Sequence, residues 1–516
     1  MEKITLNMNN TPVTQPESLR TYEIPINITR KAFEGLRRQG MSFHQAVCEI
    51  VDDAIAASKG QALVCIAFAA DEDKNYLHMA IADWGCGMDI NGLTNALQLG
   101  SLPAGDNRLN EHGFGLNNAL SCLSDETGTW SIYTRRDKGD YLKVSGPFDT
   151  RMTAETVSTP YLPDGLNLHW DEPSTIVYIR VPMDTVRTVQ RRSSARLTDL
   201  SVLRTLLSEH LGVTYRGYLE QNPDTMDPYA KIAVSIGESV RFVAPIEVPM
   251  TMTQRETLEF ELGGEVVTAT YVHGLLDKTK CETLVQGCRA KYYYQGNQPT
   301  QGIDIRLGKR VIATAQLGEI WRKEDGNPIA RHNSYNDFVG ELLLPELPRG
   351  VLATLNNKTG IDRSDHGWEK VFEALRDYPP QKNTLFFNEE ELKQKWAEFQ
   401  RSVDDENDVS TEFTVWPTGT RIDVVVSNET GKCDIYELKA RKAEPLNLYQ
   451  LRMYWDGLVL SGVQPTRGTL LAASYSDTLV QMAALMNELP PPAFPDGTPS
   501  ERYNFTIAAH ADKHLA

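Results

Sequence analysis

Three acidic side chains on one face of an N-terminal helix constrain this chain more than any other feature. Residues 42–57 carry apolar side chains at a spacing near 3.6, as in an amphipathic helix, and Ser42 is a suitable N-cap. Glu49, Asp52 and Asp53 stand at i, i+3 and i+4, so they share one face of that helix. Clustered carboxylates need water or a cation, so the segment predicts either a solvated acidic edge or a site for magnesium and phosphate.

A first glycine turn follows this helix. Residues 77–82 alternate as a strand does, and the motif D-W-G-C-G-M at 83–88 comes directly after them. Gly85 and Gly87 permit a sharp turn and a close approach of the backbone to a ligand. Asp–Gly turns are common, so the weight of the prediction rests on the position of Asp83, about thirty residues after the acidic helix.

A second glycine turn ends a polar loop over residues 96–112. Gly113 and Gly115, in the motif E-H-G-F-G-L at 111–116, lead into an apolar helix over 116–123. The free N–H groups and the dipole of a helix N-terminus favour phosphate. No G-x-x-x-x-G-K-[ST] motif occurs in the sequence, so a nucleotide would be held without a P-loop.

The order of these motifs resembles that of the GHKL ATPases, which include gyrase, heat-shock chaperone ATPases, histidine kinases, MutL and MORC proteins. The resemblance implies a Bergerat-type ATPase sandwich that binds ATP and Mg²⁺, with residues 96–112 as its lid. Glu49 takes the place of the general base, and Asp83 that of the residue that bonds the adenine amino group. Asp53 stands where the family has a magnesium-binding asparagine. A carboxylate also binds magnesium, but it adds negative charge beside the triphosphate.

The remaining ATP-binding positions also follow from this resemblance. Gly85, Gly87, Gly113 and Gly115 form the two glycine turns. Thr175, at the start of a predicted strand over 176–181, takes the place of the residue that contacts the adenine-binding aspartate. Taken alone, Thr175 is an ordinary β-branched strand residue.

Residues 181–376 alternate between strand-like and helical segments and resemble the transducer domain of MutL- and MORC-like proteins. In that family the second domain supplies a lysine to the γ-phosphate. Lys358, in the N-N-K-T-G loop at 356–360, takes that place, and Lys309 and Arg310 are rival positions. Without the upstream motifs, Lys358 would be read as an exposed turn lysine.

A second candidate site lies near the C-terminus, in two predicted strands joined by a short turn. Asp423 lies in the first strand, and Glu437 and Lys439 lie two residues apart in the second, so their side chains face the same side. Two carboxylates can bind a divalent metal, and a lysine can act on water or phosphate. The alternative is a hairpin with a surface Glu–Lys pair.

This D…E-x-K pattern resembles the PD-(D/E)xK nucleases and implies a restriction-endonuclease-like αβα domain with Mg²⁺ or Mn²⁺. Gln450 and Tyr454 match the Q-x-x-x-Y element that follows the site in one branch of these enzymes. An acid on the preceding helix, Glu390 or Glu391, often completes the metal site in the family. The proline that often precedes the first aspartate is absent here.

Length and composition indicate a mixed α/β (α+β) protein of about three domains. We predict an ATPase domain over 1–180, a transducer-like domain over 181–376, and a nuclease-like domain over 385–516 after a linker at 377–384. The seven cysteines lack zinc spacing and are typical of reduced thiols. No apolar run of membrane-spanning length and no signal-peptide core occurs, so we expect a cytoplasmic protein without membrane contact. The net charge of −17 argues against a wholly basic nucleic-acid coat.

Together these patterns predict an ATP-gated, dimerising ATPase coupled to metal-dependent DNA cleavage. Its partners would be ATP, DNA, a second copy of the chain and proteins encoded beside it. Related ATPase–nuclease fusions resemble prokaryotic anti-phage or restriction systems. Two alternatives remain: a MutL-like DNA repair or remodelling factor, and a chaperone-like conformational ATPase whose last domain only binds.

Overall fold

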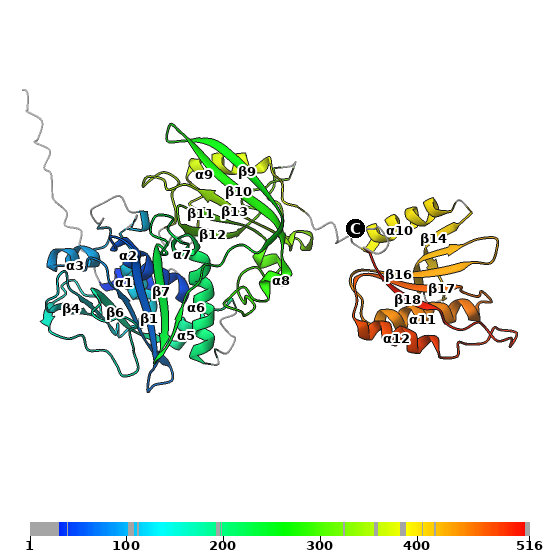
Figure 1. Ribbon diagram of the computed structural model, residues 1–516, viewed down its shortest axis with the longest axis horizontal. Helices are drawn as coiled ribbons and strands as arrows, with labels where there is room; N and C mark the ends of the chain where they lie inside the picture. The colour runs from blue at the N-terminus through cyan, green and yellow to red at the C-terminus, as the bar shows by residue number, and fades with distance from the viewer. Residues whose placement is uncertain are drawn as a thin grey trace, which may run out of the picture. The chain divides into compact units, whose positions relative to one another are not determined.

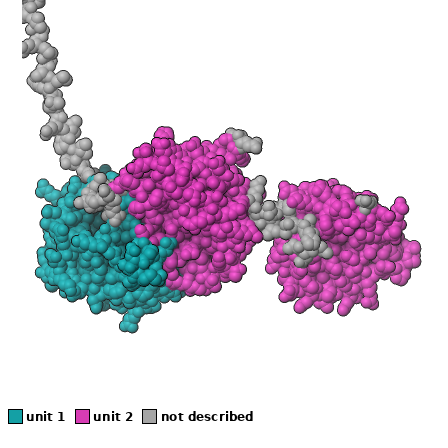
Figure 2. Space-filling view, turned by 45° about the horizontal axis from the view of Figure 1, so that its top comes forward, with its two compact units in different colours: residues 1–211, 218–243, 356–358 teal, residues 212–217, 244–355, 359–516 magenta. Residues whose placement is uncertain are grey.

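The computed structural model describes residues 30–38, 40–101, 108–110, 113–191, 197, 199–323, 326–355, 360–381, 389–404, 406–416 and 419–510. Residues 1–211, 218–243 and 356–358 form one compact unit, and residues 212–217, 244–355 and 359–516 form the other (Figure 2). Helices and mixed sheets occur in both units, which confirms the predicted α+β class. All seven cysteines are free thiols.

An eight-stranded sheet organises the first unit, in the order β5-β4-β3-β6-β2-β1-β7-β8. Its strands are β1 Ala62–Ala70, β2 Tyr76–Asp83, β3 Trp130–Thr134, β4 Tyr141–Ser145, β5 Ala154–Val157, β6 Thr175–Pro182, β7 Ala230–Ile236 and β8 Ser239–Phe242. Neighbours β1 and β2 are antiparallel, whereas β1 and β7 are parallel. Because β7 and β8 pair into this sheet, it extends beyond the domain boundary that we predict at residue 180.

Helices α2 and α4 carry the predicted nucleotide motifs, and they pack against each other. The predicted helix over 42–57 is α2, Phe43–Ala56, and the Ser42 N–H donates to Oε1 of Gln45 at 2.9 Å. The helix predicted over 116–123 is α4 and begins one residue earlier, at Gly115. The other helices of this part of the chain are α1 Arg30–Arg37, α3 Ile90–Leu97, η1 Arg108–Asn110, α5 Met183–Arg187, α6 Leu200–Thr214 and α7 Arg216–Leu219.

A five-stranded sheet in the second unit has the order β12-β11-β13-β10-β9. Its strands are β9 Met250–Leu262, β10 Glu265–Leu276, β11 Gly302–Leu307, β12 Arg310–Gln316 and β13 Phe338–Leu344. Helix α9, His366–Arg376, packs on β9 and buries Trp368 and Phe372 in a core with the sheet. Short helices α8 Lys278–Cys281, η2 Gln298–Thr300 and η3 Asn333–Tyr335 lie in the connections.

The C-terminal part of the second unit is a three-layer αβα arrangement. Its sheet has the order β14-β15-β16-β17-β18, with β14 Asp408–Thr414, β15 Arg421–Ser427, β16 Cys433–Lys442, β17 Arg467–Ser474 and β18 Phe505–Ala509. Helix α10, Glu389–Val403, lies on one face, and α11, Pro445–Leu460, and α12, Asp477–Asn487, lie on the other (Figure 1). Two separate apolar cores, one on each face, hold these layers together.

Among the described residues, no helix combines the length and the apolar character needed to cross a membrane.

Candidate functional site

Asp83 ends β2 inside the first unit, in a buried and hydrogen-bonded position. The antiparallel register pairs Asp83 with Thr175 at the start of β6. The Gly85 N–H donates to Oδ1 of Asp83 at 2.9 Å, and the Thr175 hydroxyl also bonds this carboxyl. Only 9% of Asp83 is exposed, and this burial raises the pKa of its carboxyl to about 7. A carboxyl in this state can accept a hydrogen bond from a ligand amino group.

The turn after Asp83 is packed so closely that its glycines cannot carry side chains. A Cβ on Gly87, whose φ is +57°, would lie 1.8 Å from the carbonyl oxygen of Arg135. A Cβ on Gly85 would lie 2.8 Å from the Ala57 Cβ. Both glycines are therefore required by the packing of this turn, whatever their role toward a ligand.

Thr134 on β3 completes the polar contacts around Asp83, and our sequence analysis did not identify it. Its hydroxyl accepts from the Met88 N–H at 2.9 Å and lies 3.1 Å from the Thr175 hydroxyl. Thr134 follows four strand residues without any motif, so only its pairing partner, Thr175 on β6, marks it.

The Glu49 carboxylate faces the N-terminus of α4. Glu49 is fully buried on α2, and a Cβ on Gly115 would lie 2.5 Å from its Oε2. A negative charge is favoured there by the N–H groups and the dipole of α4. Asp52 is also fully buried, whereas Asp53 is half-buried, so this acidic face is not a solvated edge.

The base of the predicted lid is closed by its two glycines. The Gly100 N–H donates to the Gly113 carbonyl at 3.1 Å, and a Cβ on Gly113 would lie 2.3 Å from the Ser101 carbonyl oxygen. The two ends of the loop therefore lie together, and Gly113 has a φ of +67° that favours glycine. Residues 102–107, 111 and 112 lie outside the described residues.

The sequence predicts three alternative residues for the cation that contacts the γ-phosphate: Lys358, Lys309 and Arg310. Lys358 lies outside the described residues. Arg310 is 5% exposed, and its guanidinium lies 5.9 Å from the ring centroid of Tyr215 within the second unit. Gly217 lies close to the backbone of Lys309. A Cβ on Gly217 would lie 2.8 Å from the Lys309 carbonyl oxygen.

In the C-terminal domain, three acidic residues stand in one row across three strands. The register that pairs Thr411 with Val424 puts Glu412 of β14 opposite Asp423 of β15. The register that pairs Val424 with Tyr436 puts Asp423 opposite Glu437 of β16. We call Glu412, Asp423 and Glu437 the acidic row. Like charges directly opposite destabilise a sheet, so this row needs cations.

Lys439 and a backbone amide hold the two carboxylates of the predicted metal site. Lys439 Nζ lies 2.9 Å from Oε1 of Glu437 and 3.4 Å from Oε2 of Glu389. The Leu438 N–H donates to Oδ2 of Asp423 at 2.8 Å. Burial, followed by the nearby Asp423, raises the pKa of Glu437 to about 7, and burial also raises the pKa of Asp423.

The predicted supporting residues divide into one that reaches this site and others that bond elsewhere. Tyr454 is buried and its hydroxyl bonds Glu437. Gln450 accepts from Nδ2 of Asn447 at 3.0 Å. Glu390 pairs with Lys393 at 3.0 Å and its side chain is 62% exposed, while Glu391 is exposed. On this helix the acid nearest Lys439 is thus Glu389, one residue before the predicted Glu390.

Lys393 and Glu412 also lie at this site, although no sequence motif marks either residue. Lys393 lies in a helix that reads as a charged surface segment, and Glu412 lies in a strand without a motif. The structure buries Lys393 to 9% exposure and pairs it with Glu412. Only the packing of α10 over β14 and β15 brings them together.

The donor set fits a divalent cation held partly by water or substrate. In the part of the chain that the structure describes, no group of three or more His, Cys, Asp or Glu side chains is arranged to hold a metal by itself. Magnesium is commonly bound through one or two carboxylates plus waters and phosphate, which Asp423 and Glu437 can provide. The ion pairs around them join five carboxylates to three cations, a net charge of −2: Glu389, Glu390, Glu412, Asp423 and Glu437 with Lys393, Arg421 and Lys439.

Comparison with known proteins gives little further information. No protein family model matches this sequence, and no curated protein matches it. The solved structures that are similar include the crystal structure of the N-terminal domain of a DNA repair protein, with a TM-score of 0.37 and 14% sequence identity. The match covers 67% of this chain and 95% of that one. These values place the chain in no named family.

Proposed function

We propose that this protein is an ATP-dependent, dimerising ATPase that is coupled to metal-dependent DNA cleavage. The observation that carries the ATPase half is the pair of buried carboxylates around α2 and α4. Glu49 lies against Gly115 at the start of α4, and Asp83 lies at the end of β2 beside the closely packed turn of Gly85 and Gly87. Each group suits one end of an adenine nucleotide, and the order of the motifs along the chain supports the same assignment.

In this proposal Asp83 accepts a hydrogen bond from the adenine amino group, and the N-terminus of α4 binds phosphate oxygens. Glu49 takes a proton from the water that attacks the γ-phosphorus, and the bond from that phosphorus to the bridging oxygen breaks to release ADP. Asp53, half-buried on the same helix, contributes to magnesium binding.

The nuclease half rests on the acidic row and Lys439. Asp423 and Glu437 would hold Mg²⁺ or Mn²⁺, which supplies an acidic water and offsets charge on the phosphodiester. The Lys439 ammonium would donate a hydrogen bond to the phosphate oxygen on which negative charge develops. Tyr454 keeps Glu437 oriented through its hydroxyl. Because the chain is acidic overall, DNA would be held by few Lys and Arg contacts.

The test combines two assays on the full-length protein. Plasmid DNA is incubated with Mg²⁺ or Mn²⁺, with and without ATP, and ATP hydrolysis is followed in parallel. Lys439→Met should keep or tighten Mn²⁺ binding and keep ATP hydrolysis but lose cleavage, because an ammonium is not a metal ligand. Cleavage that survives Glu437→Gln would refute the nuclease assignment.

Dimerisation is tested separately. A non-hydrolysable ATP analogue should increase the dimer fraction in sedimentation, whereas ADP should not, because a γ-phosphate sensed from two sides favours one closed state. Equal dimer fractions with the analogue and with ADP would contradict ATP gating. Biological context, including anti-phage defence, is then tested by deleting the gene and challenging the host with phage.

A further inference from the structure

Lys393 is a buried cation at the edge of the candidate nuclease site. It lies on α10 and is 9% exposed. Its ammonium pairs with Glu412 and lies 3.0 Å from Oε2 of Glu390 and 3.9 Å from Oδ1 of Asp423. Lys393 therefore places a positive charge against one of the two carboxylates that the proposed metal would use.

Lys393 faces Oδ1 of Asp423, the oxygen that does not accept the Leu438 N–H. Oδ2 accepts the Leu438 N–H at 2.8 Å, and this backbone bond fixes the carboxylate in the sheet. Oδ1 is the oxygen that faces Lys393. A divalent cation held by Asp423 and Glu437 would therefore share the Asp423 carboxylate with the Lys393 ammonium.

Glu412 keeps Lys393 in this position. Glu412 has a φ of 54°, a left-handed conformation that is costly for a residue with a side chain. It stands in the acidic row opposite Asp423, and its second oxygen lies 3.6 Å from Arg421. With Glu390 and Glu412 both paired to Lys393, the ammonium has no low-cost route away from Asp423.

We propose that Lys393 is a built-in counter-cation that competes with the divalent metal for Asp423 and so sets the metal concentration at which the site fills. This inference rests on the proposed metal site. In the metal-free protein Lys393 offsets the repulsion within the acidic row. When metal binds, the same ammonium repels it across Asp423.

The experiment measures Mn²⁺ binding to the full-length protein by calorimetry without nucleotide. Asp423→Asn supplies the baseline that assigns binding to this site. Lys393→Met should bind Mn²⁺ about tenfold more tightly than the natural protein, because a unit positive charge 3.9 Å from an oxygen of the proposed metal ligand Asp423 is removed. Lys395→Met removes the same charge from an exposed position on α10 and should change the affinity little.

A second variant keeps the test decisive where Lys393→Met fails to fold. Lys393→Gln removes the same charge but keeps a polar side chain that can bond Glu412, so Mn²⁺ should again bind more tightly than in the natural protein. Equal affinity in Lys393→Met and the natural protein, or weaker binding in Lys393→Met, would overturn the inference while leaving the metal site intact. Equal Mn²⁺ binding by the natural protein and Asp423→Asn would instead overturn the metal site itself, and this inference with it.

Discussion

Two aspartates at opposite ends of the paired strands β2 and β6 have opposite electrostatic surroundings. Asp71 follows β1 directly, and Nε of Arg180 lies 2.5 Å from its Oδ2. Hydrogen bonding by Arg180 holds the pKa of Asp71 below its usual value. Asp83, at the other end, is bonded by an amide and a hydroxyl, and its burial raises its pKa to about 7.

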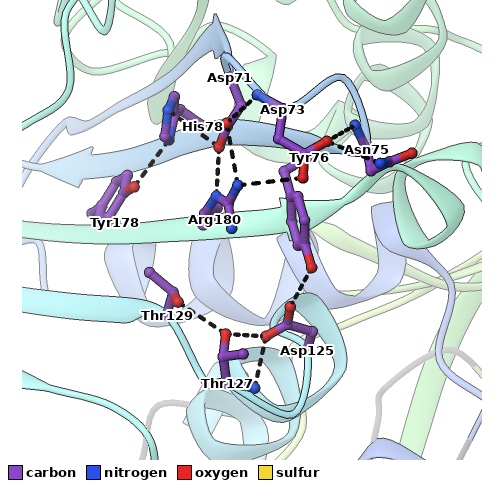
Figure 3. A network of polar contacts seen from close by, with 10 residues as sticks. All are labelled: Asp71, Asp73, Asn75, Tyr76, His78, Asp125, Thr127, Thr129, Tyr178 and Arg180. Atoms are coloured by element: carbon purple, nitrogen blue, oxygen red, sulfur yellow. Dashed lines mark hydrogen bonds and ion pairs between the residues drawn. The ribbon is translucent and has the colours of Figure 1, made fainter.

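The surroundings of Asp71 form a clamp that joins separate segments of the first unit (Figure 3). His78 Nε2 lies 3.4 Å from Asp71, and its Nδ1 lies 3.0 Å from the Tyr178 hydroxyl. Arg180 lies 3.7 Å from the ring centroid of Tyr76, whose hydroxyl donates to Asp125 at 2.8 Å. The β1–β2 turn, β6 and the loop before β3 are thus tied together.

The contrast separates a carboxylate whose charge is paired within the fold from one that we propose binds a ligand. The charge of Asp71 is compensated within the protein, so its removal should weaken the fold and leave ligands unaffected. Asp83 is buried, and neither of the two groups that bond it is a cation. Burial therefore destabilises its ionised form. Side chains with strongly shifted pKa values cluster at functional sites in proteins. Glu437 in the C-terminal domain belongs with Asp83 in this respect, because its pKa is also raised to about 7.

We expect the largest effect on activity from a change at Glu49, which we group with Asp83 and Glu437 as a carboxylate proposed to act on a ligand. Glu49→Gln should lower ATP turnover by about 10²- to 10⁴-fold, the usual contribution of a general base. Nucleotide affinity should remain, since Glu49 acts on the attacking water. Steady-state hydrolysis and calorimetry measure the two quantities, with Asp71→Asn as a control that should keep normal turnover per folded molecule. Unchanged turnover would remove Glu49 from the mechanism.

The next effect concerns Glu437. Glu437→Gln should weaken Mn²⁺ binding by at least about tenfold, since even changes outside the ligand shell cost about 10- to 100-fold. Asp434→Asn is the matched control, because Asp434 is buried on the same strand but pairs with Lys432 at 3.8 Å. It should bind Mn²⁺ normally. Equal losses in both variants would mean that Glu437 is structural.

Stability should separate the two aspartates of the first unit. Asp71→Asn removes the nearest charged partner of Arg180, leaving Asp73 at 3.9 Å, and should lower the free energy of unfolding by about 1–3 kcal/mol. Asp83→Asn removes a buried carboxylate and should leave stability unchanged or raise it. Denaturant titrations of both variants give the comparison. A large loss in Asp83→Asn would place that residue with Asp71 as part of the fold.

The smallest effect is a pH dependence that follows from the pKa of Asp83 near 7. The folded-state pKa lies above the usual value near 4, so ionisation of Asp83 costs stability as pH rises through that window. Nucleotide binding uses the ionised form and has the opposite sign. ATP affinity should therefore rise about tenfold between pH 6 and pH 8. Asp83→Asn should flatten this profile, and an unchanged slope in that variant would assign the titration elsewhere.

Local sequence patterns predicted those parts of the fold that depend on neighbours in the chain. The 3.6 period of residues 42–57 gave α2 to within one residue at each end. The hairpin of β15 and β16 puts Asp423 opposite Glu437 because these strands are consecutive. The burial of Thr175 beside Asp83 needs the β2–β6 pairing, and the family resemblance rather than the local sequence predicted that contact.

Features that depend on contacts between residues far apart in the chain could not be predicted from local sequence patterns. Strand β7 joins the first sheet by parallel pairing with β1, more than a hundred residues earlier, and no local period signals such a partner. The burial of Lys393 depends on α10 packing over β14, and the contact of Glu389 rather than Glu390 with Lys439 depends on the rotation of that helix. The sequence of this charged helix alone predicts neither the burial of Lys393 nor the contact of Glu389 with Lys439.

The most direct test of the central claim is calorimetric titration of ATP into the natural protein, Asp83→Asn and Asp71→Asn at pH 8. We expect ATP to bind to the natural protein and to folded Asp71→Asn with the same affinity. Asp83→Asn should bind at least about tenfold more weakly, the loss expected for a hydrogen bond to a charged acceptor. Equal ATP affinity in Asp83→Asn and the natural protein, or no binding to the natural protein, would contradict the assignment of this site to ATP.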